Sequence, residues 1–325
     1  MVIGEWQKLE KKHRREKKQK KQNHASLFIS VVKRSFIWIS VVVACAIASL
    51  FVYNYLFPVK KTVPVSENRQ EIPGIPEKKI TKAVPSGTSS KSFKLPVNAE
   101  IPRLQVKQKE QVVKHEGYTV SYNSDYRIAN WVAYELTAAE AKSKKTNRSN
   151  KFVPDPMVKG ASATNEDYTR TGYDRGHLAP AGDMKWSAKA MRESFYFSNI
   201  CPQKPGLNRG IWKDLEEQCR LWAMDNRMLL IATGPVISDD LERMGKNKVA
   251  VPALFYKVIC TIVNNKPEGI AFLFENRDYR DISLESVAIP IDSVEKVTGI
   301  DFFPSFPDDH ESRMEAGINW NVWSF

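Results

Sequence analysis

The sequence predicts one α+β domain with a mixed, largely antiparallel sheet and flanking helices, preceded by a linker and one transmembrane helix. Three observations lead to this prediction. Over residues 112–325, runs typical of strands are mixed with helical patterns, without the regular order of a parallel βαβ fold. Residues 36–57 form an apolar run of 22 residues without a charge. Between these two parts lies a proline-rich segment that lacks apolar periodicity.

Residues 1–35 form a basic tail with 11 Lys/Arg and 3 Asp/Glu, net +8. The apolar run 36–57 that follows is long enough to cross a bilayer as a helix. Because most of the flanking basic residues precede the run, the tail is expected to stay cytoplasmic and the rest of the chain to be translocated. The run exceeds the roughly 7–15 apolar residues of a cleaved signal peptide, which favours an uncleaved signal anchor. The expected protein is therefore a single-pass membrane protein whose C-terminal domain lies on the periplasmic or extracellular side.

Residues 58–111 are expected to be a linker rich in proline, lysine and serine. The segment carries seven prolines and a net charge of +6. Such a segment stays extended and solvated because it cannot bury enough apolar surface to offset its chain entropy.

Residues 112–325 are expected to form one domain, since 214 residues suffice for a sizeable core. The strands are expected at Tyr118–Tyr122, Trp131–Leu136, Phe195–Ile200, Met228–Thr233, Leu254–Val263 and Gly269–Phe274. The helices are expected at Ser187–Ser194, Gly210–Asp225 and Asp292–Thr298. This part has a net charge of −2, so the overall charge of +12 is no sign that the domain itself binds polyanions.

The four cysteines of the chain do not have the spacing of a structural zinc site, because no CxxC pair occurs. Cys45 lies in the apolar run. A disulfide between Cys201 and Cys219 and a set of free thiols remain equally compatible with the sequence.

Two segments of the domain carry residues suited to catalysis. In the first, Asp174–His177, a histidine follows an arginine and a glycine, as a general base beside an anion requires. The glycine is expected to permit a special backbone conformation. In the second, Asn208, Trp212, Glu216 and Arg220 recur every four residues and share one broad helix face. An ordinary surface pair of Glu216 and Arg220 is the alternative interpretation.

Together these segments resemble the DNA/RNA non-specific endonuclease family over roughly residues 115–305. The resemblance is carried by the Asp-Arg-Gly-His run 174–177, by Asn199 nine residues before Asn208, and by the pattern from Asn208 to Arg220. Membership implies a ββα-metal nuclease core within the predicted sheet and helices.

The resemblance also implies a role for each site residue. His177 is the general base, and Asn208 is the direct protein ligand of Mg²⁺, with Mn²⁺ as the alternative ion. Glu216 orients the waters around the ion, Asn199 positions the site, and Arg175 and Arg220 stabilise phosphate charge. Asp174 opens the motif and is counted with the site, and Arg148 is the candidate for a further family arginine.

These roles predict an endonuclease that hydrolyses phosphodiester bonds of DNA and RNA without sequence specificity. If water is the nucleophile, no 2′-hydroxyl is needed and both polymers can react. The expected partners are DNA, RNA, the membrane through residues 36–57, and a second copy of the chain in a homodimer. The basic residues between Lys142 and Lys159 are either a phosphate track or a solvated loop. The alternative function is a catalytically silent nuclease-fold module that binds nucleic acid or protein at the membrane surface.

Overall fold

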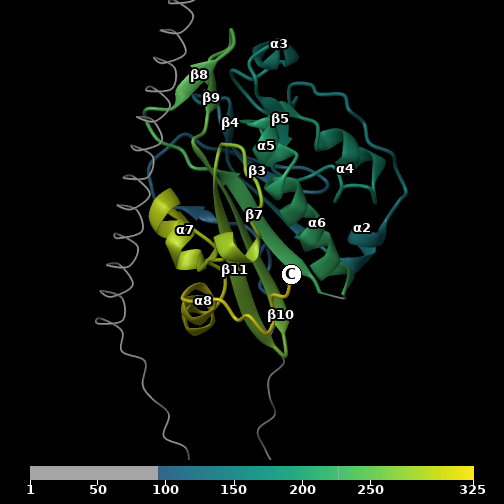
Figure 1. Ribbon diagram of the computed structural model, residues 1–325, viewed down its shortest axis with the longest axis vertical. Coiled ribbons are helices and arrows are strands. Elements are labelled where there is room, and N and C mark those ends of the chain that lie inside the picture. The colour runs from purple at the N-terminus through teal and green to yellow at the C-terminus, as the bar shows by residue number, and fades with distance from the viewer. Residues whose placement is uncertain (1–93, 226) are drawn as a thin grey trace, which may run out of the picture. The chain divides into compact units, whose positions relative to one another are not determined.

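The computed structural model describes residues 94–225 and 227–325, which belong to one compact unit (Figure 1). The basic tail, the expected membrane span 36–57 and most of the expected linker lie outside the described residues. Within the described ranges, no helix is both long and apolar enough to cross a membrane.

A seven-stranded, fully antiparallel sheet forms the centre of the unit, with the strand order β12-β11-β10-β7-β4-β3-β2. Its strands are β2 (Gln111–Lys114), β3 (Thr119–Asn123), β4 (Ile128–Leu136), β7 (Leu229–Pro235), β10 (Leu254–Val263), β11 (Lys266–Glu275) and β12 (Ala288–Ile289). The prediction of a sheet-dominated, largely antiparallel α+β fold is therefore confirmed.

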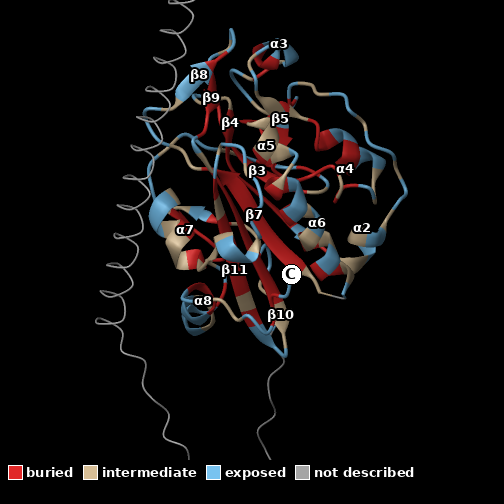
Figure 2. Ribbon diagram, viewed as in Figure 1, coloured by how far each residue is buried: buried red, intermediate tan, exposed pale blue. Residues whose placement is uncertain are grey.

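Both faces of this sheet are buried (Figure 2). Because successive side chains of a strand point to opposite faces, the central strands carry apolar residues at successive positions. Along β4, Val132 and Tyr134 belong to one core, whereas Trp131 and Ala133 belong to the other. The same alternation continues in the neighbouring strands. The sheet thus separates two hydrophobic cores, each of which needs a covering layer.

Helices supply these two layers (Figure 1). The first core includes Trp212, Leu215 and Trp222 of α6 (Ile211–Met224). The second core includes residues of α7 (Ile291–Thr298) and α8 (Asp308–Glu315). Gly299 ends α7 with a φ of 65°, a left-handed conformation that glycine adopts without strain.

A separate ββα unit lies on the α6 side of the sheet. Strand β5 (Asp174–His177) pairs antiparallel with β6 (Ile200–Gln203), and α5 (Pro205–Asn208) and α6 follow directly. The Asp174–His177 segment is thus a strand. Gly176 has no positive φ, contrary to the expected special backbone conformation. A Cβ there would lie 2.0 Å from the side-chain oxygen of Gln203, so the glycine is needed for close packing of β5 on β6.

The remaining elements are short. They are β1 (Arg103–Leu104), α2 (Ala138–Lys142), α3 (Asn165–Tyr168), α4 (Ala188–Glu193), the 3₁₀ helix η1 (Phe197–Asn199), β8 (Glu242–Met244), β9 (Val249–Val251), the 3₁₀ helix η2 (Glu285–Val287) and β13 (Ile300–Asp301).

Two boundaries differ from the sequence-based expectation. The strand expected at Phe195–Ile200 is the 3₁₀ helix η1, and the strand β6 begins only at Ile200. The folded part also begins before residue 112, because β1 pairs with β13 through Arg103–Asp301 and Leu104–Ile300. Residues 94–111 of the expected linker thus contribute to the domain.

The three described cysteines, Cys201, Cys219 and Cys260, are free and buried. Of the two alternatives left open by the sequence, the structure therefore has free thiols, and burial raises the pKa of each.

Candidate active site

A cleft of about 300 Å³ opens between β5 and the N-terminal half of α6. Most of its lining side chains are polar or basic. They are Arg148, Arg175, His177, Asn208, Arg209, Lys213, Glu216, Glu217 and Arg220, with Pro180, Ala181 and Gly182. Seven of the eight predicted site residues therefore lie at this cleft or in direct contact with its lining, and only Asn199 is set back from it.

His177 lies at the end of β5 and is 7% exposed. Its ring packs against Phe195, with the ring centroids 4.8 Å apart, and against Phe152. Among the described residues, its Nε2 atom has no hydrogen-bond partner. Burial, and then the charge of Arg148, lowers the pKa of His177 to about 3. The imidazole is therefore neutral and able to accept a proton at physiological pH.

Helix α6 and the central sheet fix the backbone at His177. The indole Nε1 of Trp212 donates a hydrogen bond to the carbonyl oxygen of His177 over 3.2 Å. The ammonium group of Lys257, from β10, donates to the carbonyl oxygen of Leu178 over 3.4 Å. The end of β5 is thus attached both to the helix and to the sheet beneath it.

Asn199 does not line the cleft, because it is fully buried behind β5. Its carboxamide accepts a hydrogen bond from the amide nitrogen of Ala179 and donates to the carbonyl oxygens of Ala179 and Ser194. These contacts hold the chain directly after His177. The geometry agrees with a positioning role and gives Asn199 no contact with a reacting atom.

The orientation of Asn208 depends on Asp174. The side-chain nitrogen Nδ2 of Asn208 donates a hydrogen bond to Asp174 Oδ2 over 3.0 Å, and the guanidinium of Arg209 donates to both carboxylate oxygens of Asp174. Burial raises the pKa of Asp174, but the hydrogen bonds from Arg209 and Asn208 outweigh it and leave this pKa below its usual value. Because the nitrogen of Asn208 is engaged, its carbonyl oxygen remains available to a ligand.

Glu216 and Arg220 lie on α6 and line the same cleft as Asn208, which is the last residue of α5. The single helix face predicted from the four-residue spacing is therefore wrong, because the chain turns between α5 and α6 and Trp212 is buried in the core. Arg220 donates to Asp183 Oδ1 over 2.8 Å, and Asp183 also accepts from the hydroxyl of Tyr134. Burial raises the pKa of Glu216 to about 8, although the charge of Lys257 opposes this shift. Arg220 therefore pairs with Asp183, which the surface-pair interpretation did not include.

Arg148 and Arg175 reach the cleft from outside α6. The guanidinium of Arg148 lies 5.1 Å from the ring centroid of Phe195, and that of Arg175 lies 4.5 Å from the ring centroid of Phe152. Arg148 otherwise donates to Asn150, and Arg175 to Asn165. Within the described part of the chain, neither forms a salt bridge, so both positive charges are free to meet an anion.

The oxygen atoms at the cleft suit a hard divalent cation. Asn208 at the end of α5 and Glu216 of α6 line the cleft together, with His177 on the strand β5. Mg²⁺ prefers oxygen ligands and retains several waters, so one amide oxygen with solvent and a phosphate oxygen completes a plausible shell. The fixed amide of Asn208 is the observation that supports this fit.

Three residues of the site were not singled out in the sequence. Asp183 and Arg209 each form an ion pair that orients an expected site residue, and Lys257 lies fully buried beneath α6. Burial lowers the pKa of Lys257, while Cys219, Glu216 and Asp183 raise it. Lys257 did leave a signal, because it is the one charged residue of the apolar run 254–263. Asp183 and Arg209 lie close to motif residues in the sequence, but no spacing pattern marks them as site residues.

His115 is buried outside the cleft. Its Nε2 atom lies 2.9 Å from Asp155 Oδ2, which also accepts from the hydroxyl of Ser198. This group joins β2, η1 and the loop between them and contacts none of the residues of the catalytic cleft.

Comparison with known proteins assigns the chain to a family. Human mitochondrial endonuclease G is 34% identical over 208 residues, which cover 60% of this chain and 70% of the human protein. The mitochondrial nuclease EXOG of Danio rerio is 34% identical, over 62% of this chain and 63% of its own length. Endonuclease G of Caenorhabditis elegans is 30% identical, over 79% of this chain and 92% of its own length.

A solved structure has the same fold. A chain in a crystal structure of an endonuclease G complex with its inhibitor EndoGI superposes with a TM-score of 0.57 and 32% identity, covering 63% of this chain and 90% of that chain. Residues 97–309 match the family described as DNA/RNA non-specific endonuclease. Because this match spans more than half of the sequence, the chain belongs to the DNA/RNA non-specific endonuclease family.

Proposed function

We propose that this chain is a divalent-metal-dependent endonuclease that hydrolyses phosphodiester bonds in DNA and RNA without reading sequence. One observation carries the proposal: His177 and Asn208 line one cleft together with Arg148 and Arg175. Among the described residues, neither arginine forms a salt bridge. A silent binding module would have no need for a desolvated imidazole at the same cleft.

His177 serves as the general base in this proposal. Its imidazole ring accepts a proton from the attacking water, for which a neutral imidazole is required. The burial that lowers the pKa of His177 keeps the ring neutral over the working pH range. Phe195 and Phe152 hold the ring plane, and the hydrogen bond from Trp212 holds the backbone at the same residue.

Asn208 is the protein ligand for Mg²⁺, or for Mn²⁺, through its carbonyl oxygen. The ion, when bound, neutralises charge on a phosphate oxygen and on the leaving oxygen. Asp174 fixes the carboxamide so that the oxygen, and not the nitrogen, faces the ion. Glu216 accepts hydrogen bonds from waters at the cleft.

Arg148 and Arg175 bind the phosphate group. Their guanidinium groups rest on Phe195 and Phe152, which restricts their motion before substrate arrives. Arg220 adds positive charge from the other wall, where Asp183 holds it in place. Contacts of this kind address the backbone and not the bases, which accounts for cleavage without sequence specificity.

The same chemistry tolerates both sugars. With water as the nucleophile, no 2′-hydroxyl takes part in the reaction, so the proposed substrates include DNA and RNA alike. The loop 142–159 contains Arg148 together with exposed lysines, and these lysines would extend the phosphate-binding surface.

We also propose that residues 36–57 anchor the chain in a membrane, with the tail cytoplasmic and the nuclease domain on the periplasmic or extracellular side. The proposal rests on the uncharged 22-residue run and the basic residues before it. After cell fractionation, the full-length chain should stay in the membrane pellet after alkaline carbonate washing. A chain without residues 36–57 should be soluble. Release of the full-length chain by carbonate would contradict the anchor.

Replacing the proposed base tests the catalytic assignment. The variant His177→Asn should lose about 10²–10⁴-fold of the magnesium-dependent cleavage of plasmid DNA and of RNA. Cleavage by the unchanged chain should stop when a chelator is added. The matched variant His310→Asn, on α8, should cleave at the unchanged rate. Full activity of His177→Asn, with an unaltered circular dichroism spectrum, would exclude His177 as the base.

The lowered pKa of His177 also predicts how stability depends on pH. In the unfolded chain His177 takes up a proton below its usual pKa of about 6.5, whereas in the folded chain it is protonated only below a pKa of about 3. Stability from His177 is therefore present above pH 6.5 and is lost as the pH falls. Between pH 6 and pH 4 the free energy of unfolding, measured with urea and chelator, should fall less steeply for His177→Asn, by up to about 1.4 kcal/mol per pH unit. Equal slopes would show that the folded imidazole titrates normally.

Removing the carboxylate that orients Asn208 should weaken metal binding. In Asp174→Ala the carboxamide can rotate, and the Mg²⁺ concentration for half-maximal activity should rise about 10–100-fold. Much of the activity should return at high Mg²⁺. Asp214→Ala, which removes an exposed carboxylate in the first turn of α6, is the control and should leave the Mg²⁺ dependence unchanged. An unchanged Mg²⁺ dependence of Asp174→Ala would refute the orienting role.

A further inference from the structure

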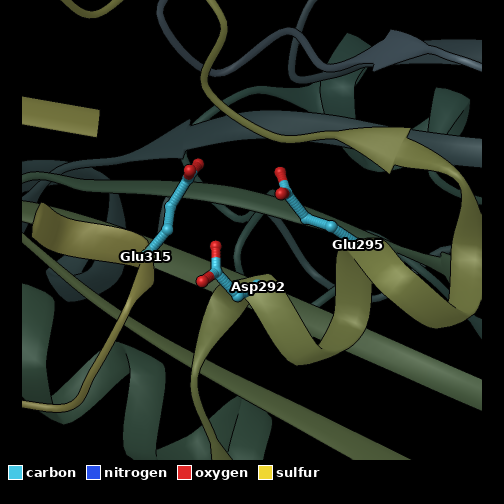
Figure 3. Close-up of side chains that lie close together, drawn as sticks. All are labelled: Asp292, Glu295 and Glu315. Atoms are coloured by element: carbon cyan, nitrogen blue, oxygen red, sulfur yellow. The ribbon is translucent and has the colours of Figure 1, made fainter. Parts of the chain in front are cut away.

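Three carboxylates meet on the side of the sheet opposite the catalytic cleft. Asp292 and Glu295 lie one turn apart on α7, and Glu315 is the last residue of α8. One oxygen from each of the three lies within 4.8 Å of the others. Figure 3 shows the side chains of Asp292, Glu295 and Glu315 converging from the two helices on a common space.

Glu315 is the member of this acidic triad that most needs a partner. It is 6% exposed, and its Oε1 atom is buried without a hydrogen-bond partner among the described residues. In Figure 3 its carboxylate lies beside the space that it shares with the carboxylates of Glu295 and Asp292. A buried carboxylate oxygen without a donor is costly, and the cost increases beside other carboxylates.

Further acidic residues surround Glu315, and few basic residues balance their charge. Burial, and then Glu295, Glu311, Asp292 and Asp301, raise the pKa of Glu315 to about 9. Of these groups, Asp301 is paired with Arg103 over 2.5 Å. Among the described residues, no lysine or arginine forms a salt bridge with the triad, and Lys296 contributes only a weak opposing charge at Glu295.

The triad also has free ligand atoms. One oxygen of Glu295 accepts a hydrogen bond from the amide nitrogen of Phe302 over 2.8 Å, which fixes the carboxylate and leaves its second oxygen. Two ligands of one Ca²⁺ ion, each about 2.4 Å from it, can be at most about 4.8 Å apart. The three oxygen atoms lie within this limit of one another.

We propose that Asp292, Glu295 and Glu315 form a second divalent-cation site, of the calcium type, that clamps α7 to α8. The ion would neutralise the buried Glu315 carboxylate and join the two helices that cover this face of the sheet. Calcium fits better than magnesium, because it accepts several carboxylates in irregular geometry, whereas magnesium requires near-octahedral order. The site is structural and separate from Asn208.

The rival explanation is a proton held on Glu315. A neutral carboxyl group would also relieve the repulsion, and it would do so without any cation. The two explanations differ in one measurable respect: only a cation site makes stability depend on calcium.

The test measures thermal unfolding of the full-length chain, kept in mild detergent, with Ca²⁺ or with chelator. It uses the Asn208→Ala background, so that a cation at the catalytic cleft does not contribute. Ca²⁺ at ten times its Kd should raise Tm by about 4 °C. Calorimetric titration should give one Ca²⁺ per chain, with Mg²⁺ binding at least tenfold more weakly.

Two further variants in this background decide the assignment. Adding Glu315→Gln should abolish the rise in Tm with Ca²⁺, because the variant cannot supply a carboxylate ligand. Adding Asp309→Asn, an exposed acidic residue of α8 outside the triad, should keep the full response to Ca²⁺. No rise in Tm with Ca²⁺, or the same rise with Glu315→Gln, would overturn the site and leave the shared proton as the explanation.

Discussion

The hydrogen bond from the Trp212 indole to the carbonyl oxygen of His177 links the two halves of the catalytic cleft. Trp212 belongs to the apolar core between α6 and the sheet, where its ring meets Phe255 and Phe274 edge to face. One side chain therefore serves packing and positioning together. His177 on β5 keeps a fixed distance from α6, because Trp212 belongs to α6 and its indole binds the backbone of His177.

Charge compensation beneath the cleft follows from this packing. Lys257 projects from β10 into the core below α6, with its ammonium group 4.7 Å from the ring centroid of Trp212. Its pKa is raised by Cys219, Glu216 and Asp183, which oppose the effect of burial. A buried charge is tolerated where opposite charges and hydrogen bonds surround it. The sheet thus contributes electrostatics as well as support, because the charge of Lys257 opposes the rise that burial causes in the pKa of Glu216 and of Asp183.

The sequence predicts well those elements whose signal is local. The strand β10 has the expected bounds Leu254–Val263, because nine of its ten residues are apolar or β-branched and most of the strand is buried. The segment 195–199 has a similar composition but forms a turn and η1, in which Phe195 packs on His177 and Phe197 stacks on Tyr168. Strand β1 was assigned to the linker because its partner β13 is almost two hundred residues away, so no local pattern marks it.

The site divides in the same way. The family motif and the helical spacing located His177, Asn208, Glu216 and Arg220, which the structure brings to one cleft. The residues that orient them depend on tertiary contacts. Asp183 has no distinctive pattern, yet it joins Tyr134 of the sheet to Arg220 of α6. A carboxylate with such a role becomes recognisable only when both partners are in place.

The distribution of charge over the domain decides from which side a polyanion can approach. Residues 112–325 carry a net charge of −2, so net charge alone gives no attraction for nucleic acid. The cleft nevertheless presents Arg148 and Arg175 without carboxylate partners, whereas the acidic residues of α7 and α8 lie behind the sheet. Fields of opposite sign on the two faces attract a phosphate backbone to one side and repel it from the other. A nearly neutral domain can thus be selective for the direction of binding without excess positive charge.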